Sequence, residues 1–304
     1  MDKAYADTVR LLLAAAPDVF ANDIFAMKGG TAINLFVRDM PRLSVDIDVV
    51  YTRWQIPRDE ALAAISDELD NIAKRLAGQG LRTRKVLSKD LDDTKLLIER
   101  EDSQVKVEVN TVFRGTVLPI ERRALTPNTA EMFSAGLELP VLAKAELYGG
   151  KLVAALDRQH PRDLFDVWQM FESDGLLDKT VECFVTYLAG HNRPTHEVLF
   201  GNDKDIADEY HNNFTGMTTE SISLDVLLET RARLRAELPQ RLTDNQRRFL
   251  IGLARAQPDW TLLQCQHAAE LPALRWKLAN LHTFQKRRPD DFESQAKALE
   301  AKLG

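Results

Sequence analysis

The sequence has little of what marks an exported or membrane-bound protein. Among its 304 residues there are two cysteines, Cys183 and Cys265, which are too few for a disulfide framework or a cysteine zinc site. No apolar run approaches the length needed to cross a bilayer. The first residues, Met1-Asp2-Lys3-Ala4, lack the basic, apolar and small-residue order of a signal peptide. These absences predict a cytoplasmic protein with no membrane partner.

An excess of positive charge is also missing. The formal net charge is -6, which argues against a basic coat for nucleic acid over the whole surface. A local basic face is still compatible with this value, because binding depends on where the charges lie. The hydrophobic fraction of 44% and the charged fraction of 28% are typical of a globular protein with a real core.

The two halves of the chain carry different patterns. Residues up to about 174 mix strand and helix signals, whereas the remainder has almost only helix and loop signals. We therefore predict an α+β fold, with an N-terminal mixed sheet and flanking helices followed by an all-helical C-terminal region. The expected domains are 1–140 and 141–304. The expected strands are 24–27, 45–51, 81–87, 95–100 and 105–110, and the expected helices are 5–16 (ended by Pro17), 31–37, 57–78, 142–156, 161–174, 223–238, 244–255, 271–281 and 290–303, with an irregular excursion at 190–216.

Two acidic residues, Asp46 and Asp48, alternate with apolar residues in the expected strand 45–51. Side chains at i and i+2 of a strand point to the same face, so these carboxylates project side by side and repel one another unless a cation lies between them. Hard oxygen ligands of this kind suit Mg²⁺ with a bound nucleotide phosphate. Glu108 would add a third carboxylate if strand 105–110 lay beside strand 45–51, and three carboxylates can hold two metal ions. The alternative is an ordinary strand whose acids face solvent, since such short motifs also arise by chance.

A glycine turn, Lys28-Gly29-Gly30-Thr31, lies between an expected strand and an expected helix. Glycines let the backbone approach a phosphate closely, and the helix that follows offers unpaired N–H groups. Thr31 can cap this helix or donate its hydroxyl to a phosphate. Arg42 and Ser44, just upstream of the Asp pair, are candidates for holding a triphosphate and supporting a carboxylate. The alternatives are a simple tight turn and a solvated loop.

A third cluster lies on the expected helices 142–156 and 161–174. Lys144, Lys151 and Arg158 are seven residues apart, so they follow one stripe along a helix. Asp163 and Asp166 are one turn apart and can pair with these cations. A surface ladder of ion pairs is the simplest interpretation. The apolar neighbours of Lys151 argue instead for a partly buried lysine with an anionic partner.

These segments resemble the AbiEii/AbiGii nucleotidyltransferase toxins of the polymerase-β-like superfamily. The resemblance spans about residues 24 to 170, and the order and spacing of its segments make it specific. The matching segments are Lys28-Gly29-Gly30-Thr31-Ala32, Arg42-Leu43-Ser44-Val45-Asp46-Ile47-Asp48-Val49, Lys106-Val107-Glu108-Val109-Asn110, Leu142-Ala143-Lys144-Ala145-Glu146, Gly150-Lys151-Leu152-Val153-Ala154-Ala155-Leu156-Asp157-Arg158 and Arg162-Asp163-Leu164-Phe165-Asp166. Beyond residue 174 we find no matching motif.

The resemblance implies a nucleotidyltransferase core in 1–140 and a helical domain in 141–304 that carries the late motifs and an acceptor-binding surface. An NTP would be the co-substrate. Mg²⁺, with Mn²⁺ as the alternative, would bind Asp46 and Asp48, with Glu108 in the third acidic position. The nucleotide would be bound by Lys28, Gly29, Gly30, Thr31, Arg42, Ser44, Lys144 and Arg158. Lys151 and Asp166 match the essential lysine and aspartate of the late motifs. All these groups must therefore converge on one cleft. The acceptor would be a tRNA 3′ end, and the partner would be an antitoxin, often a winged-helix repressor encoded nearby.

Two other functions remain open at this stage. The same chemistry on a small molecule or on a protein hydroxyl would be favoured without a basic surface of RNA size, and a non-catalytic binding module would keep only the fold. The helical tail provides candidate cations for RNA, interleaved with Trp276, His282 and Phe284. Solvated helix faces are the equal alternative for these cations. They are Arg231, Arg233, Arg235, Arg241, Arg247, Arg248, Arg275, Lys277, Lys286, Arg287 and Arg288.

Overall fold

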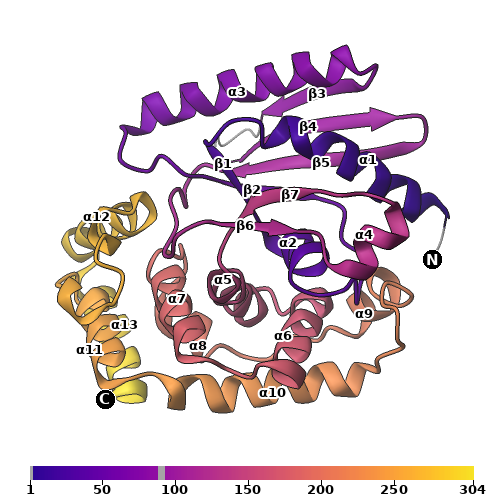
Figure 1. Cartoon of the computed structure of the whole chain (residues 1–304). Coiled ribbons are helices and arrows are strands. Elements are labelled where there is room, and N and C mark those ends of the chain that lie inside the picture. The colour runs from indigo at the N-terminus through magenta and orange to yellow at the C-terminus, as the bar shows by residue number, and fades with distance from the viewer. Residues whose placement is uncertain (1–2, 88–92) are drawn as a thin grey trace. The chain divides into compact units, whose positions relative to one another are not determined.

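The computed structural model describes residues 3–87 and 93–304 (Figure 1). The described chain divides into two compact units. Unit 1 comprises Met1–Leu147 with Met217–Glu220, and unit 2 comprises Tyr148–Gly216 with Ser221–Gly304. The roles predicted for domains 1–140 and 141–304 stay predictions.

Unit 1 is built on a mixed sheet. Within the described residues the sheet has seven strands in the order β3-β4-β5-β2-β1-β7-β6. The pairs β2–β5 and β1–β7 are parallel, and the other neighbouring strands are antiparallel. The strands are β1 (Phe25–Lys28), β2 (Ile47–Tyr51), β3 (Arg82–Leu87), β4 (Asp93–Arg100), β5 (Ser103–Asn110), β6 (Glu121–Ala124) and β7 (Glu138–Val141).

Helices pack on this sheet (Figure 1). Helix α1 (Lys3–Val19) contacts β4, β5 and α3 (Arg58–Gly78), and α3 contacts β3 and β4, so these two helices form one layer. Helix α2 (Gly29–Phe36) contacts β1 and β2. Strand β5 alternates buried Val105, Val107 and Val109 with half-buried polar residues, as expected for a strand with one face in the core. Helix α4 (Pro127–Phe133) completes the helical elements that lie wholly in unit 1.

Helix α5 (Lys144–Asp157) begins in unit 1 and continues into unit 2. Its first turn contains Glu146, whose side chain is fully buried. The two carboxylate oxygens of Glu146 accept the backbone N–H groups of Val117, at 2.7 Å, and Leu118, at 2.8 Å. Hydrogen bonds to an ionised acceptor are stronger than neutral ones, so Glu146 fixes the loop before β6 to the start of α5.

Unit 2 is helical. The pairs α6–α10, α7–α11, α8–α13, α11–α13 and α12–α13 are among those in contact. Thr243 and Gln246 form a capping box at the start of α11, and the Ser223 side chain caps α10. The helices of unit 2 are α6 (Pro161–Ser173), α7 (Asp178–Ala189), α8 (Thr195–Leu199), α9 (Ala207–Asn213), α10 (Leu224–Arg241), α11 (Asp244–Ala254), α12 (Pro272–Arg287) and α13 (Pro289–Leu303), and the short 3₁₀ turns η1 (Trp260–Leu262) and η2 (Ala268–Glu270) lie between α11 and α12.

The predicted fold class is confirmed, with several local corrections. Pro17 does not end the first helix but lies inside its last turn, where a missing N–H removes only one hydrogen bond and burial of Val19 and Phe20 holds the turn. The region 190–216, predicted to be irregular, contains α8 and α9. No helix of the described chain is long and apolar enough to span a membrane.

Besides α8 and α9, four strands and helices were not predicted from the sequence, namely β6, β7, α4 and α7. Strand β6 lies at the edge of the sheet, and its residues are mostly exposed and polar. It therefore lacks the apolar alternation from which a strand is predicted. Strand β7 contains Pro140, a residue that argues against a strand in sequence-based prediction.

Candidate functional site

A row of charged residues crosses four adjacent strands of unit 1. In the pairing register Lys95 of β4 lies opposite Glu108 of β5, Glu108 lies beside Asp48 of β2, and Asp48 lies opposite Lys28 of β1. Residues directly paired across strands project to the same face of a sheet. The prediction that Glu108 adds a carboxylate beside Asp48 requires β2 and β5 to be adjacent, and they are. The row places two carboxylates side by side between two lysines.

The carboxylate of Asp48 lies against the backbone of the glycine turn. A Cβ atom built on Gly29 would be 2.1 Å from Asp48 Oδ2 and 2.8 Å from Asp48 Cγ. Gly29 also has a φ of +77°, in the left-handed region that side chains disfavour. Both facts require glycine at this position. The first residue of α2 is thus in direct contact with the carboxylate that the sequence singles out.

The second glycine of the turn is flanked by Arg42 and Ser44. A Cβ on Gly30 would be 2.6 Å from Arg42 Nη2 and 3.0 Å from Ser44 Oγ. The hydroxyls of Thr31 and Ser44 are 3.0 Å apart, and the Ser44 N–H donates to the Tyr5 hydroxyl at 3.1 Å. The buried Arg42 guanidinium donates to the Leu43 carbonyl at 2.9 Å. The turn and the segment before β2, predicted separately, therefore meet at the start of α2.

Lys106 supplies a cation to the acidic pair. Its Nζ is 3.3 Å from Asp46 Oδ1 and 3.4 Å from Glu108 Oε1, and Lys95 Nζ donates to the same Glu108 oxygen at 3.0 Å. Burial alone would lower the pKa of Lys106, but the charges of Asp46 and Glu108 outweigh it and raise that pKa. Burial alone would raise the pKa of Glu108, but the hydrogen bond from Lys95 and the charges of both lysines lower it. Glu108 is therefore held in its ionised form.

The late cluster is built within unit 2. Lys151 is 8% exposed, and its Nζ lies 2.9 Å from Asp163 Oδ1 and 2.9 Å from Asp166 Oδ2. Both aspartates are buried, and the exposed Arg158 pairs with Asp163 at 2.8 Å. The expected pairing of Lys151 and Arg158 with these aspartates is confirmed. Lys144, the first residue of α5, is half-buried. The predicted convergence of the late cluster with Asp46 and Asp48 stays a prediction.

Comparison with known proteins decides the family. A sequence profile described as nucleotidyl transferase AbiEii toxin of type IV toxin–antitoxin systems matches residues 10–280. The chain belongs to the AbiEii toxin family. The AbiEii match includes much of the helical region beyond residue 174, where motif inspection found no resemblance. The chain is accordingly a nucleotidyltransferase toxin, which takes an NTP as substrate and has an antitoxin as partner.

A solved structure supports the AbiEii fold. MenT4, a nucleotidyltransferase toxin from Mycobacterium tuberculosis H37Rv, matches with a TM-score of 0.57 over 91% of this chain and 94% of the MenT4 chain. The sequence identity is 19%, so the match is one of fold. No curated protein sequence matched the chain.

AbiEii nucleotidyltransferases usually need a divalent metal, and the donors of unit 1 fit one. Asp46 Oδ1 is a hard oxygen ligand on a side chain that is 38% exposed, and Asp48 follows two residues later. The ammonium of Lys106 near Asp46 shows that this face attracts a cation. Among the described residues no group of three His, Cys, Asp or Glu side chains is spaced to hold a metal ion. Two carboxylates suffice for Mg²⁺, because it keeps waters and takes further ligands from substrate phosphates.

Several groups of this candidate site were not predicted from the sequence. No role was predicted for Lys95 or Lys106, although each lies on a strand two residues from an acid, namely Asp93 and Glu108. The signal was available in the alternation of Lys106 and Glu108, which puts both on one face. The contact of Tyr5 with Ser44 joins residues 39 positions apart, and no local pattern predicts it.

The tail cations of the AbiEii chain require a correction. Arg231 is buried and donates to Gln159 at 3.0 Å and to the Lys204 carbonyl at 2.7 Å. Arg235 pairs with Asp203 at 2.9 Å. Arg247 of α11 donates to the backbone carbonyls of Pro239, Leu242 and Leu303. These three arginines are structural groups of unit 2. Exposed cations on α12 remain for an RNA backbone, and they are Arg275, Lys286 and Arg287.

Proposed function

We propose that this chain transfers a nucleoside monophosphate from an NTP to the 3′ hydroxyl of a tRNA, with Mg²⁺ held by Asp46 and Asp48. The observation that carries the proposal is the contact between the Asp48 carboxylate and Gly29, the first residue of α2. It unites a metal-binding carboxylate with a helix start, where backbone N–H groups bind phosphate. A nucleotide phosphate and its metal need these two partners side by side. Mn²⁺ is the alternative ion.

Residues around the turn have distinct tasks in this proposal. The N–H groups of the first turn of α2 bind the phosphates, and the absence of side chains on Gly29 and Gly30 leaves the backbone accessible. Thr31 and Ser44, whose hydroxyls are 3.0 Å apart, donate to a phosphate oxygen or orient a carboxylate. Arg42, held by its bond to the Leu43 carbonyl, contributes a fixed positive charge.

When bound, Mg²⁺ neutralises the charge of the transferring phosphate and lowers the pKa of the attacking hydroxyl. Asp48 and Glu108 are the candidates to accept the proton of that hydroxyl. Glu108 is ionised, because the hydrogen bond from Lys95 and the charges of both lysines lower its pKa against the effect of burial. A general base must be in this ionised form.

The late cluster retains its predicted role in this proposal, in which Lys151 neutralises the departing pyrophosphate and Asp166 orients Lys151. Support comes from the ion pair of 2.9 Å between Lys151 and Asp166. The amide variant Asp166→Asn tests it, because it keeps the shape and removes the charge. We expect loss of transfer in a protein that is still folded at the assay temperature, because Asp163 still pairs with Lys151.

Labelled transfer tests the proposal as a whole. The purified protein is incubated with each α-³²P-labelled NTP, Mg²⁺ or Mn²⁺, and separately with total tRNA, total protein and a small-molecule extract. We expect label on tRNA, and a loss of at least about 100-fold in Asp46→Asn and Asp48→Asn, since misplacing a reacting group by about 1 Å costs that much. Asp39→Asn is the control, because Asp39 is an exposed acid seven residues before Asp46.

Each outcome of that experiment has a clear meaning. Label on protein or on a small molecule in place of tRNA identifies the other acceptor class and overturns the tRNA assignment. Wild-type protein that labels no acceptor with either metal overturns the proposed transfer. Equal loss in Asp39→Asn and Asp46→Asn overturns the assignment of Asp46.

The antitoxin is proposed to be a winged-helix repressor encoded beside this chain. Support comes from membership in a family of type IV toxin–antitoxin systems. Expression of the chain alone should arrest growth, and co-expression of the adjacent regulator should restore it. Growth that is unaffected by the chain, or arrest that the regulator does not relieve, contradicts this partner.

A further inference from the structure

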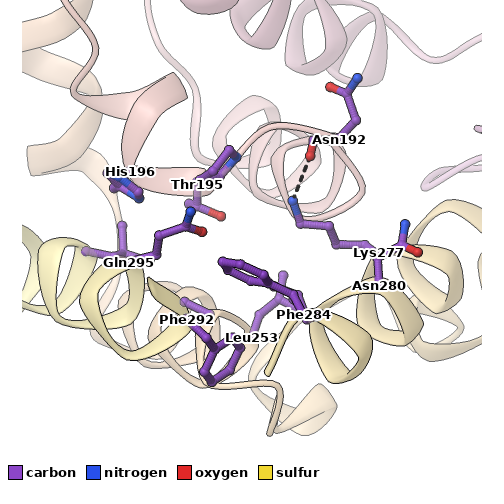
Figure 2. Close-up of a pocket in the computed structure, with 13 residues that line it drawn as sticks. Asn192, Thr195, His196, Leu253, Lys277, Asn280, Phe284, Phe292 and Gln295 are labelled. Carbon is purple, nitrogen blue, oxygen red and sulfur yellow. Dashed lines mark hydrogen bonds between the residues drawn. The ribbon is translucent and has the colours of Figure 1, made fainter. Parts of the chain in front are cut away.

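Unit 2 contains a cavity of about 250 Å³ that includes none of the residues of the proposed catalytic site (Figure 2). It lies among α8, α11, α12 and α13, with the segment before α8 as one wall. Phe284 projects into the middle of this space, and its ring meets that of Phe292 edge-on, with centroids 6.0 Å apart. The second ring supports the first and leaves its face toward the cavity. An aromatic face of this kind is a platform for a planar ligand.

A buried cation borders the same cavity. Lys277 of α12 is 6% exposed, and its Nζ donates to the backbone carbonyls of Asn192 at 3.3 Å and Arg193 at 2.8 Å (Figure 2). Throughout the part of the chain that the structure describes, no carboxylate forms an ion pair with Lys277. Burial lowers the pKa of Lys277 to about 8, against a small opposing effect of Glu197, so the amine is mostly charged at neutral pH. A buried charge without a counter-ion is costly, and this favours an anionic ligand.

The remaining polar groups suit the edge of a nucleobase. Gln295 of α13 directs its side-chain amide toward Phe284, and Asn280 of α12 stands at the rim of the cavity. Amides both donate and accept, which matches the mixed edges of unpaired bases. No Asp or Glu lines the cavity. Burial, reinforced by Lys302, lowers the pKa of His196 despite the charge of Glu197, so this imidazole is neutral.

We propose that this cavity binds one unpaired nucleotide of the acceptor RNA. The base packs on Phe284, its edge bonds to Gln295 or Asn280, and its phosphate pairs with Lys277. The inference rests on the proposed function, because it describes how the RNA acceptor is held.

Equilibrium binding without NTP or metal tests this site independently of transfer. The full chain is titrated into a fluorescein-labelled single-stranded RNA hexamer, a blunt duplex containing the same strand, and free nucleoside monophosphates as competitors, with anisotropy as the readout. Phe284→Leu should weaken binding of the single strand about 5- to 150-fold, the range that base–aromatic stacking provides. Lys277→Met should reduce the slope of log K against log salt by about one. Gln285→Leu is the control, because Gln285 lies on the same helix, is exposed and does not line the cavity.

The pattern of these variants decides the inference. Weaker binding in Phe284→Leu and Lys277→Met with wild-type binding in Gln285→Leu supports it. Gln295→Met, at a half-buried position, replaces Phe284→Leu if the latter melts below the assay temperature. Equal affinities for single strand and blunt duplex, equal losses in Gln285→Leu and Phe284→Leu, or tight binding of free mononucleotides alone overturns it. Tight RNA binding that all variants retain overturns the cavity and leaves transfer intact, whereas wild-type protein that binds RNA but labels none overturns only the transfer.

Discussion

The close contact between Gly29 and Asp48 makes Gly29→Ala a sharp perturbation of the proposed site. The added Cβ would lie 2.1 Å from Asp48 Oδ2, whereas ordinary van der Waals contact begins at 3.4 Å. The carboxylate must therefore move by about 1.3 Å, or the first turn of α2 must shift by a similar amount. Either movement separates the carboxylate from the phosphate-binding turn.

The expected cost divides between stability and catalysis. A non-glycine residue in the left-handed region costs about 1–2 kcal/mol, which a domain of ordinary stability tolerates. A reacting group displaced by about 1 Å loses a factor of about 100 in rate. We therefore expect Gly29→Ala to fold with a melting temperature lowered by a few degrees, roughly 2–4 °C per kcal/mol, and to transfer nucleotide at least about 100-fold more slowly.

Gly80 provides the matched control. It has a φ of +78°, almost the same as that of Gly29, but no atom lies within 4 Å of its virtual Cβ. Gly80→Ala thus introduces the backbone strain without the clash. The assay combines circular-dichroism melting with initial rates of labelled transfer at 25 °C. If Gly29→Ala has the same melting temperature as Gly80→Ala and transfers nucleotide at the wild-type rate, the role proposed for Asp48 is refuted.

Three further perturbations test other parts of the chain. Lys151→Met leaves the buried Asp163 and Asp166 without this cation and should cost about 3–5 kcal/mol in urea unfolding; adding Asp166→Asn should recover part of that loss, and no recovery contradicts the ion-pair argument. Glu146→Gln keeps the side-chain shape but replaces a charged acceptor of two backbone amides, so we expect a loss of about 1.5–3 kcal/mol in the free energy of unfolding, and unchanged stability would show that these bonds matter little. Burial lowers the pKa of Lys277 from 10.5 to about 8 on folding. Between these pH values the unfolded chain binds more protons than the folded chain, so the free energy of unfolding of the wild type should rise with pH by up to about 1.4 kcal/mol per unit. The difference in the free energy of unfolding between wild type and Lys277→Met should follow this rise, and a difference that is flat from pH 8 to 10 contradicts the prediction.

The sequence predicts the strands and helices that carry chemistry better than those that only complete the fold. Alternating apolar and charged residues identify β2 and β5, and this alternation places Asp48 and Glu108 each on the polar face of its own strand. The neighbouring position of β2 and β5 does not follow, because parallel pairing joins strands far apart in the chain. Strand β6 was missed because an exposed edge strand has no apolar face.

For the site, local spacing predicts which residues matter but not what satisfies them. The pairing of Lys151 with Asp163 and Asp166 could be predicted because helical spacing and apolar neighbours both indicate a buried lysine. The role of Arg231 was misjudged, since sequence shows a charge but not its burial against Gln159. Lys277 was likewise grouped with surface cations, although it is almost fully buried.

The register of β2 against β5 also bears on how such a protein diverges. Asp48 and Glu108 are brought together by main-chain pairing, which any residues with strand propensity can maintain. The apolar positions between them are then free to exchange one aliphatic side chain for another during evolution, as long as no residue is inserted that slips the register. A constraint on strand register, and not on the identity of each residue, is compatible with the fold that this chain shares with MenT4 at 19% sequence identity.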